Sequence, residues 1–397
     1  MKELSRIAEA VQASTTLKVD ALYKQMKADG KDVVGFGAGE PDFETPNNIR
    51  EAACKAIMAG QTKYTPANGI PALRQAVADR LRADCGINYT AGQIVVASGA
   101  KHNVYVALQA LLNPGDEVIL PAPYWVTYAE AIRMAGGIPV IVSAPESSDF
   151  KITKEQLETA VSSKTKLFIL NNPSNPTGML YSAEELRRLG EVCVERDIYV
   201  ISDEIYHKLV YDGKVFTSFA ALGEDLKERT IIVNGVSKTY AMTGWRIGYS
   251  ASSTRLAEVM GNYLSHSTSA PSTISQHAAV EALCGPQESV EAMRVVFEQR
   301  RDFIVESINA IEGVSCRKPD GAFYVMMNIE KLIGRTLGGK VIKDSDDFSL
   351  AFLESELVAL VSCSGFGCDN FLRLTYAASM DSIKKGMERL ERFVRGS

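Results

Sequence analysis

Lys238 is the residue in this sequence whose setting points most clearly to chemistry. It lies in VNGVSKTYAMTGWRIGY, residues 233–249, in a polar, glycine-containing turn between the apolar runs TIIVN and RIGYS. A single lysine is normally a solvated surface charge. At a strand end near a second cation, burial and charge repulsion raise the fraction of neutral, nucleophilic amine. Arg246, eight positions later, can be that cation. The pattern predicts a lysine that forms a Schiff base with a carbonyl compound.

A phosphate site is predicted close to this lysine. The guanidinium of Arg246 can hold a phosphate through two parallel hydrogen bonds, with a surface salt bridge as the alternative. In VVASGAKHNVYVAL, a strand is followed by Ser98-Gly99-Ala100 and by a helix that begins near Lys101. A helix N-terminus carries free N–H groups and partial positive charge, and glycine allows an anion to approach closely.

Polar residues also end or interrupt three other apolar strands. Asp203 follows the strand in IYVISDEIYHKL, where a helix cap or a turn aspartate is the alternative. Asn175 lies in the proline-rich turn of LFILNNPSNPTG, which suits either ligand positioning or a plain loop. Arg373 stands inside the apolar strand of NFLRLTYA, where an unpaired guanidinium is costly. We expect Arg373 to bind a carboxylate or to form a buried salt bridge.

The elements that must position these residues follow a repeated pattern. From about residue 93 to 250, short β-branched runs alternate with helical patterns, beginning with QIVVA, KHNVYVALQALL, DEVIL and YWVTYAEAIRMA. Such repeats predict an α/β fold in which a mostly parallel sheet is covered by helices on both faces. Ligands of these sheets bind at the carboxyl ends of the strands, where the polar residues above are placed.

The C-terminal part of the chain has a different pattern. Two stretches rich in helix formers, 254–284 and 287–310, precede strands near 322–326 and 371–375 and helices near 345–357 and 381–395. This pattern predicts a smaller α+β domain packed on the large one. We expect three regions: an N-terminal arm with part of the small domain at 1–45, the large domain at 46–290, and the C-terminal small domain at 291–397.

Composition excludes several classes of partner. The 43 basic and 48 acidic residues are mixed along the chain and give a net charge of −5, so neither nucleic acid nor a membrane surface is expected to bind. The start MKELSRIAEAVQAS has no secretory pattern, and the apolar runs are shorter than the roughly 20 residues that span a bilayer. The seven cysteines form no C-x-x-C pair and the four histidines have no metal-ligand spacing. We therefore expect a cytoplasmic protein without a metal.

The segment SKTYAMTGWRIG resembles the lysine signature of class I and II aminotransferases, which are fold-type-I enzymes dependent on pyridoxal 5′-phosphate. The motifs GEPDF, YTPANG, SGAK, PYW, NPTG and SDEIY occur in the order typical of this family. The similarity extends over nearly the whole chain and is closest to bacterial aspartate aminotransferases of the Ib subgroup. It implies a large cofactor-binding domain of fold type I and a smaller α+β domain.

The resemblance implies a role for each residue of the cofactor site. Lys238 holds pyridoxal phosphate as a Schiff base and later carries a proton between the substrate Cα and the cofactor. Ser237 and Arg246 bind the phosphate, Asp203 pairs with the pyridine nitrogen, and Tyr206 donates a hydrogen bond to the phenolic oxygen. The turn before the predicted helix completes the phosphate site with Gly99, Ala100 and Lys101.

The resemblance also implies a substrate site. Arg373 binds the substrate carboxylate, Gly39 approaches it through its backbone, and Asn175 contacts both this carboxylate and the phenolic oxygen. Trp125, which could otherwise be a core residue, stacks on the cofactor ring and reaches the carboxylate. Lys101 helps to recognise the acidic side chain in the aspartate-specific subgroup.

Tyr64 in KYTPANG resembles the family's tyrosine that reaches the phosphate of the neighbouring subunit. This resemblance implies a homodimer, whereas a tyrosine packed locally in a loop is the alternative.

The expected reaction is ping-pong transamination between aspartate and 2-oxoglutarate. An aromatic, methionine or alanine aminotransferase and a β-lyase of the same fold are the alternatives. Two departures from the family pattern bear on the substrate: Gln12 replaces a lysine tied to acidic and prephenate-type substrates, and the usual Val-Pro-Gly turn reads Val361-Ser362-Cys363.

Two classes of rival function are disfavoured. A nucleotide-dependent oxidoreductase requires G-x-G-x-x-G at the start of a helix. Here GFGAGE at 35–40 has another spacing and runs into Pro41. A sensor domain of a regulator requires an added DNA-binding segment, for which the sequence has no spare residues.

Overall fold

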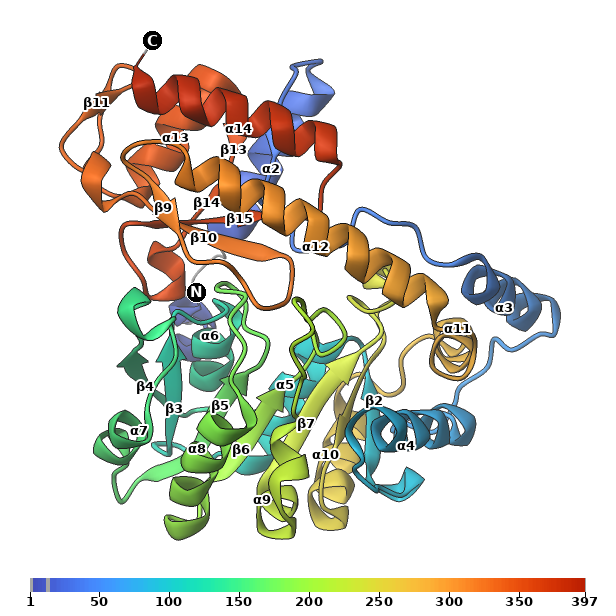
Figure 1. The fold of residues 1–397 in the computed structure, drawn as a ribbon. Helices are drawn as coiled ribbons and strands as arrows, with labels where there is room; N and C mark the ends of the chain where they lie inside the picture. The colour runs from blue at the N-terminus through green and yellow to red at the C-terminus, as the bar shows by residue number, and fades with distance from the viewer. Residues whose placement is uncertain (1–2, 12–14, 397) are drawn as a thin grey trace.

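A seven-stranded sheet forms the centre of the larger part of the molecule (Figure 1), in a computed structural model that describes residues 3–11 and 15–396. Its strand order is β2-β8-β7-β6-β5-β3-β4. Strand β8 is antiparallel to β2 and β7, and the other neighbours are parallel. The predicted α/β fold with a mostly parallel sheet is confirmed. The strands are β2 (Ile94–Ala97), β3 (Glu117–Ala122), β4 (Ile138–Ser143), β5 (Thr165–Asn171), β6 (Tyr199–Asp203), β7 (Thr230–Gly235) and β8 (Gly248–Ala251).

Helices cover both faces of this sheet, as expected for strands that are apolar on both sides. Alternate side chains of a strand point to opposite faces, so Val95 and Ala97 pack in one core cluster while Ile94 and Val96 pack in another. One face is covered by α5 (Ala100–Leu111), α6 (Thr127–Met134) and α10 (Thr254–Ser267). The other is covered by α4 (Pro71–Cys85), α7 (Lys154–Ala160), α8 (Ala183–Glu195), α9 (Glu224–Arg229) and α11 (Thr273–Cys284).

Local signals determine where individual helices begin. Helix α8 starts after Ser182, whose hydroxyl accepts from the Glu185 N–H at 3.2 Å while the Glu185 carboxylate accepts from the Ser182 N–H at 2.7 Å. This reciprocal capping box satisfies two amides that the helix leaves unpaired. Helix α4 begins with Pro71, since proline lacks only an N–H that has no partner at this position.

A four-stranded antiparallel sheet of order β14-β15-β10-β9 lies in the smaller part of the molecule. Its strands are β9 (Ser315–Cys316), β10 (Tyr324–Asn328), β14 (Val361–Ser362) and β15 (Phe371–Thr375). The neighbouring helices are α2 (Thr15–Ala28), α12 (Glu288–Asn309), α13 (Ser345–Glu356) and α14 (Met380–Arg395). The predicted smaller α+β domain is therefore present, and α14 buries its apolar stripe of Ile383, Met387, Leu390 and Phe393.

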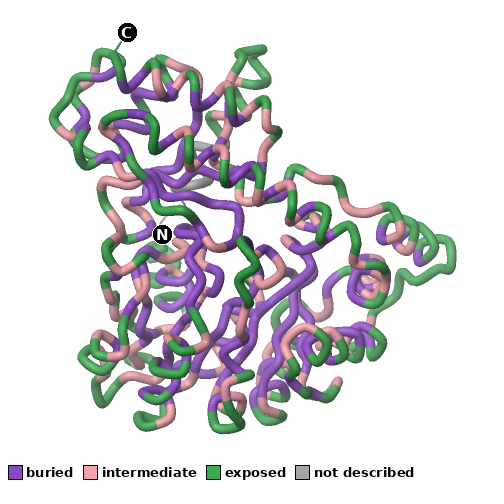
Figure 2. Tube along the Cα trace, in the orientation of Figure 1, coloured by how far each residue is buried: buried purple, intermediate pink, exposed green. Residues whose placement is uncertain are grey.

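Short pairings connect distant parts of the sequence. Strand β1 (Val34–Gly35) runs parallel to β13 (Val358–Ala359), and β11 (Thr336–Leu337) pairs with β12 (Lys340–Val341). Residues near the N-terminus thus pack with the C-terminal third, while the expected boundaries at 45 and 290 stay predictions. Figure 2 shows that burial is concentrated in the strands of the central sheet and in the smaller sheet above it.

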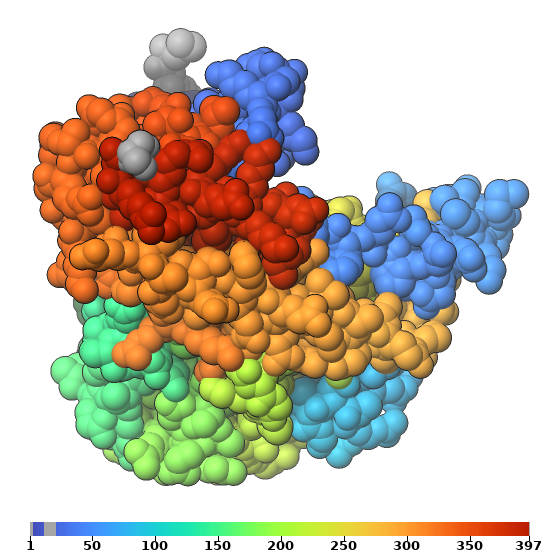
Figure 3. All heavy atoms as spheres, turned by 45° about the horizontal axis from the view of Figure 1, so that its top comes forward, coloured from blue at the N-terminus to red at the C-terminus, as the bar shows by residue number. Residues whose placement is uncertain are grey.

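Helix α3 (Asn47–Met58) packs against α11 and projects from the body of the molecule (Figure 3). The short helix α1 (Arg6–Ala10) packs near α6. None of the described helices is both long enough and apolar enough to cross a membrane.

Candidate active site

The carboxyl ends of the central strands open into a cavity of about 390 Å³ that also reaches residues of the smaller sheet. Strand β6 delivers Asp203, the turn after β5 delivers Asn175, and the loop after β7 delivers Lys238. The cavity brings together most of the predicted site residues: Gly39, Ala100, Lys101, Trp125, Asn175, Asp203, Tyr206, Ser237, Lys238, Arg246 and Arg373. Residues predicted from motifs far apart in the sequence therefore share one site.

Lys238 lies in the wall of this cavity between β7 and β8. Its Nζ donates a hydrogen bond to the carbonyl oxygen of Gly39. Burial lowers the pKa of Lys238 to about 8, and the positive charges of Arg246 and Arg373 act in the same direction, whereas the carboxylate of Glu40 raises it. A substantial fraction of this amine is therefore neutral and nucleophilic at a moderately alkaline pH.

Asp203 is buried at the end of β6 and is 3% exposed. Its Oδ2 accepts a hydrogen bond from the Oη of Tyr128 at 2.7 Å, and its Oδ1 accepts from the Ile205 N–H at 3.2 Å. Burial raises the pKa of Asp203 to about 6, while these hydrogen bonds lower it. The carboxylate is therefore largely ionised at pH 7 and can pair with a protonated ring nitrogen.

Arg373 on β15 is a buried cation that lines the cavity and is 3% exposed. Its Nη1 donates to Asn175 Oδ1 at 3.0 Å and its Nη2 donates to the Gly37 carbonyl at 2.8 Å, while its Nε has no partner in the described part of the chain. The Tyr324 ring lies 4.5 Å from its guanidinium carbon. Both of these acceptors are neutral, so the charge is available to an anion in the cavity.

The predicted phosphate turn lies at the start of α5. Gly99 adopts a φ of 89°, which favours glycine, and a Cβ there would lie 2.4 Å from Arg246 Nη2, so a side chain would displace this guanidinium. Arg246 Nη2 in turn donates to the Ser98 carbonyl at 3.2 Å. On the other side of this turn, a Cβ at Gly248 would lie 2.1 Å from the Ala100 nitrogen. Ala100, Lys101 and Arg246 line the cavity, so the N-terminus of α5 and a guanidinium meet at this tight turn.

Trp125 and Lys101 occupy one side of the cavity. The Lys101 Nζ lies 4.9 Å from the centre of the Trp125 ring, and Trp125 meets the Tyr128 ring edge to face at 5.3 Å. Burial, and then the charge of Arg246, lowers the pKa of Lys101. The arrangement holds a flat aromatic surface beside an amine.

Comparison with known families accounts for these features together. The family model "Aminotransferase class I and II" matches residues 31–390, which include the cavity residues from Gly37 to Arg373. The chain belongs to this family of aminotransferases. The predicted family resemblance is thus confirmed.

Relatives of this aminotransferase match it over nearly its full length. The aspartate aminotransferase of Bacillus subtilis (strain 168) is 48% identical over 392 residues, which cover 99% of each protein. The solved structure of the aspartate aminotransferase from Rhizobium meliloti has a TM-score of 0.96 and 41% identity and covers 100% of both chains. That of Thermus thermophilus with maleate has a TM-score of 0.93 and 38% identity over 99% of this chain and 100% of that chain.

Two of the predicted site residues, Tyr64 and Gly99, are not among those that line the cavity of the aminotransferase. Tyr64, between α3 and α4, is fully exposed and does not line the cavity of its own chain. Gln12 lies outside the described residues. The departure at 361–363 falls on β14 and the residue after it, where Ser362 Oγ lies 2.8 Å from Ser345 Oγ and burial raises the pKa of the Cys363 thiol. No described group of histidine, cysteine and acidic residues could hold a metal ion.

Sequence reasoning missed several residues of this aminotransferase that line or support the cavity. Tyr128 hydrogen-bonds Asp203, and Tyr324 Oη lies 2.9 Å from Tyr206 Oη. Asn171 accepts from the Asn175 N–H at 2.7 Å and fixes the start of its turn. Glu40 and Thr243 join across the cavity mouth at 2.7 Å. Among these residues, Tyr128 could have been predicted from its spacing. It stands three positions after Trp125, and residues three apart can lie on the same face of a helix.

Proposed function

We propose that this aminotransferase binds pyridoxal 5′-phosphate on Lys238 and moves the amino group between aspartate and 2-oxoglutarate. The observation that carries the proposal is the pair of Lys238 and Arg373 in one cavity. The first is an amine whose pKa is lowered to about 8, and the second is a buried guanidinium with neutral partners. Together they suit an amino acid that must be held by its carboxylate beside a nucleophilic amine.

The residues present fit the cofactor. The tight turn at Gly99, where a side chain would collide with Arg246, leaves backbone amides and a guanidinium for a phosphate. We assign the phosphate to Ser237, Arg246 and the turn formed by Gly99, Ala100 and Lys101. The buried carboxylate of Asp203 suits the protonated ring nitrogen, and Trp125 offers a face for the ring.

When bound, pyridoxal phosphate supplies an electron sink for the pair of electrons left when a proton leaves the substrate Cα. The protein residues do the remaining work. Lys238 accepts the proton that leaves the substrate Cα and delivers it to the cofactor, because a pKa lowered to about 8 leaves part of its amine neutral and able to accept a proton near that pH. Arg373 and Asn175 hold the substrate carboxylate, and the Gly39 backbone borders it. Tyr206 donates a hydrogen bond that favours the ionised phenolic oxygen.

Both substrates are carboxylic acids, and we assign the same clamp, Arg373, to each. They therefore bind in turn, which is ping-pong order. The Lys101 amine beside Trp125 is a second cation that can meet the distal carboxylate of a dicarboxylic substrate. The named relatives support this assignment, because they are aspartate aminotransferases and one was solved with maleate, itself a dicarboxylate.

Tyr64 supports a homodimer as the working unit. Its ring is fully exposed on the segment between α3 and α4, where it is available to a second copy of the chain. We infer that Tyr64 contributes to the phosphate site of that copy. Composition and the bacterial relatives support a cytoplasmic enzyme.

Cofactor spectroscopy tests the central assignment. The purified protein should be yellow with pyridoxal phosphate bound, and Lys238→Ala should lose both the long-wavelength absorbance and transamination. A wild-type protein that cannot take up the cofactor would contradict the proposal. Lys227, which pairs with Glu224 outside the cavity, provides the control variant Lys227→Ala, expected to keep both properties.

A panel of amino donors with 2-oxoglutarate tests the substrate. Aspartate should be preferred, and Lys101→Ala should lower turnover of aspartate more than that of alanine. Negligible activity with aspartate beside good activity with an aromatic, methionine or alanine donor would show that the alternative substrates are correct. Equal losses for acidic and apolar donors would contradict the role of the Lys101 side chain.

A further inference from the structure

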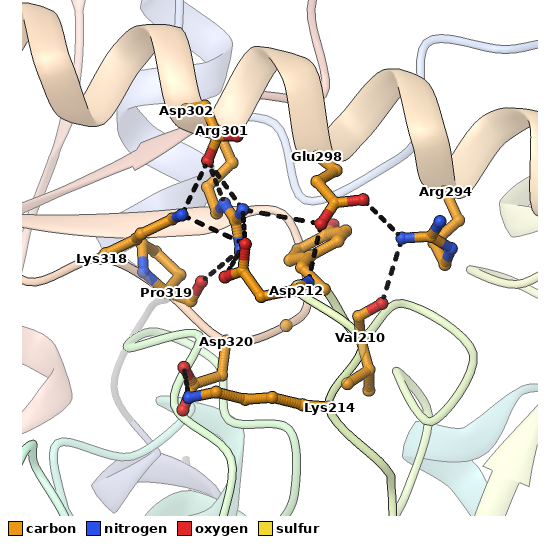
Figure 4. Close-up of polar contacts among 12 residues, drawn as sticks. Val210, Asp212, Lys214, Arg294, Glu298, Arg301, Asp302, Lys318, Pro319 and Asp320 are labelled. Atoms are coloured by element: carbon orange, nitrogen blue, oxygen red, sulfur yellow. Dashed lines mark hydrogen bonds and ion pairs between the residues drawn. The ribbon is translucent and has the colours of Figure 1, made fainter.

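A cluster of polar contacts outside the cavity, most of them between charged side chains, joins helix α12 to two loops (Figure 4). One loop follows β6 and belongs to the part of the chain that carries Asp203, and the other leads into β10 of the smaller sheet. The residues of the cluster are Val210, Asp212, Lys214, Arg294, Glu298, Arg301, Asp302, Lys318, Pro319 and Asp320.

The two loops pair with each other through their backbones. The Tyr211 N–H donates to the Asp320 carbonyl at 3.0 Å, and the Ala322 N–H donates to the Leu209 carbonyl at 2.9 Å. These bonds form an antiparallel bridge between segments that are more than 100 residues apart in the sequence. The position of one loop therefore fixes that of the other.

Arg301 binds both loops at once. Its side chain is 0% exposed, and it donates to the Asp212 carboxylate at 2.8 and 2.9 Å and to the Pro319 carbonyl at 3.1 Å. It also pairs with Asp302 at 2.7 Å and lies 4.8 Å from the centre of the Tyr211 ring. A planar guanidinium can make these bonds in several directions together, which a lysine ammonium cannot reproduce.

The two tyrosines that meet in the cavity lie beside these loops, Tyr206 in the segment after β6 and Tyr324 at the start of β10. Tyr206 precedes the first bridge residue by a few positions, and Tyr324 follows the second, and their hydroxyl oxygens lie 2.9 Å apart. The Tyr324 ring also lies against Arg373. The contact between the loops therefore determines the positions of the two tyrosine hydroxyls and of the Tyr324 ring that packs against Arg373.

We propose that Arg301 is a positioning residue for amino transfer, acting through the Tyr206–Tyr324 pair. This inference rests on the proposed function, in which Tyr206 donates to the phenolic oxygen of the cofactor and Arg373 binds the substrate carboxylate. Arg301 touches neither ligand. It holds the two loops together, and so keeps the Tyr206 hydroxyl and the Arg373 guanidinium in position.

Arg301→Lys in the cofactor-loaded enzyme tests the proposal. A hydroxyl that donates a hydrogen bond to the phenolic oxygen of the cofactor favours the ionised form of that oxygen. If Tyr206 is displaced, the midpoint of the pH titration of the cofactor's absorbance should therefore rise by about half a pH unit or more. The KM for aspartate should rise about tenfold, as for the loss of roughly 1.4 kcal/mol of binding, with a smaller change in kcat. An unchanged midpoint and KM would overturn the proposal.

Two further variants separate positioning from general stability. Asp212→Asn removes the negative charge of the bidentate partner and replaces one of its two acceptor oxygens with an NH2 donor, while the buried cation remains, and it should shift the midpoint in the same direction. It also serves if Arg301→Lys does not fold. Arg389→Gln, outside the cluster, removes an ion pair to Asp32 and a hydrogen bond to the Glu356 carbonyl and should lower Tm without a shift. A shift of equal size in Arg389→Gln would show that the effect is not specific to Arg301.

A double-mutant cycle tests the route of the effect. If Arg301 acts through the tyrosine pair, Arg301→Lys should add little to the midpoint shift of Tyr324→Phe, because the two changes disrupt one interaction. Fully additive shifts would show that Arg301 does not act through the Tyr206–Tyr324 pair. A wild-type protein that binds no pyridoxal phosphate would instead contradict the proposed function, so the two failures are distinguishable.

Discussion

Tyr128 donates a hydrogen bond from its fully buried hydroxyl to Asp203 Oδ2 over 2.7 Å, which makes the tyrosine a partner of the cavity's buried carboxylate. Burial raises the pKa of Asp203 to about 6, and this hydrogen bond lowers it. The ionised carboxylate is the form that can pair with a protonated ring nitrogen.

Tyr128→Phe should therefore raise the pKa of Asp203 further. Cofactor affinity in the wild type should decline as the pH falls through about 6, where Asp203 takes up a proton. In the variant the decline should begin at a higher pH. The dissociation constant of pyridoxal phosphate, measured from pH 5 to 8, checks this. Tyr181→Phe is a matched control, since Tyr181 is also buried but bonds the Ile152 N–H; an equal displacement in both variants would exclude a specific effect of Tyr128.

Glu40→Gln should lower the pKa of Lys238 below about 8, because the Glu40 carboxylate raises it in the wild type. More of the amine is then neutral at pH 7, so the cofactor-free protein should capture pyridoxal phosphate faster, and the midpoint of the rate against pH should move down. Stopped-flow absorbance measures this rate. Glu44→Gln, on an exposed residue paired with Arg50, should leave the midpoint unchanged; an unmoved midpoint in Glu40→Gln contradicts the assignment.

Arg373→Lys should weaken binding of both substrates. A lysine keeps the charge but cannot hold a carboxylate with two parallel hydrogen bonds, so kcat/KM should fall by about 100-fold, mostly through KM. Steady-state kinetics with aspartate and 2-oxoglutarate provide the measurement. Arg335→Lys, at a site bonded to the Val394 carbonyl and outside the cavity, should retain wild-type constants. A change in kcat alone would show that Arg373 does not act as the carboxylate clamp.

Glu204→Gln should alter how stability depends on pH. Burial raises the pKa of Glu204 from 4.5 to about 7, so between these values the folded protein holds a proton that the unfolded chain has lost. The free energy of unfolding should therefore fall with rising pH in this range, by up to about 3 kcal/mol from this group.

The glutamine variant loses that decline, so its Tm relative to wild type should increase from pH 5 to 7. Thermal unfolding across this range measures the difference. Glu184→Gln, on the exposed face of α8, is the control and should show no such trend. Parallel Tm curves for Glu204→Gln and wild type would contradict a proton on Glu204.

The sheet and the motif residues could be predicted because their signals are local. Apolar runs flanked by turn residues indicated the central strands, and the stripe of Ile383 to Phe393 indicated α14. The direction of β8 was not predicted. Its connection from β7 is the loop that carries Lys238, with no crossover helix of the kind that returns a chain parallel, so β8 runs antiparallel.

Contacts between distant side chains could not be read from periodicity. Tyr128 and Asp203 are 75 residues apart, Tyr206 and Tyr324 are 118 apart, and Arg301 is 89 from its carboxylate partner. Pattern and propensity describe one element at a time, whereas these pairs depend on how elements from both sheets meet. The missed residues are those that hold the predicted ones in place.

The exposed position of Tyr64 has a consequence for how the enzyme should behave on dilution. If each phosphate site is completed by a tyrosine of another chain, cofactor binding and subunit association are thermodynamically linked. The cofactor must then strengthen association by the same factor by which association strengthens cofactor binding. A loss of the cofactor's colour on dilution that is reversed by concentrating the protein would therefore report the monomer–dimer equilibrium.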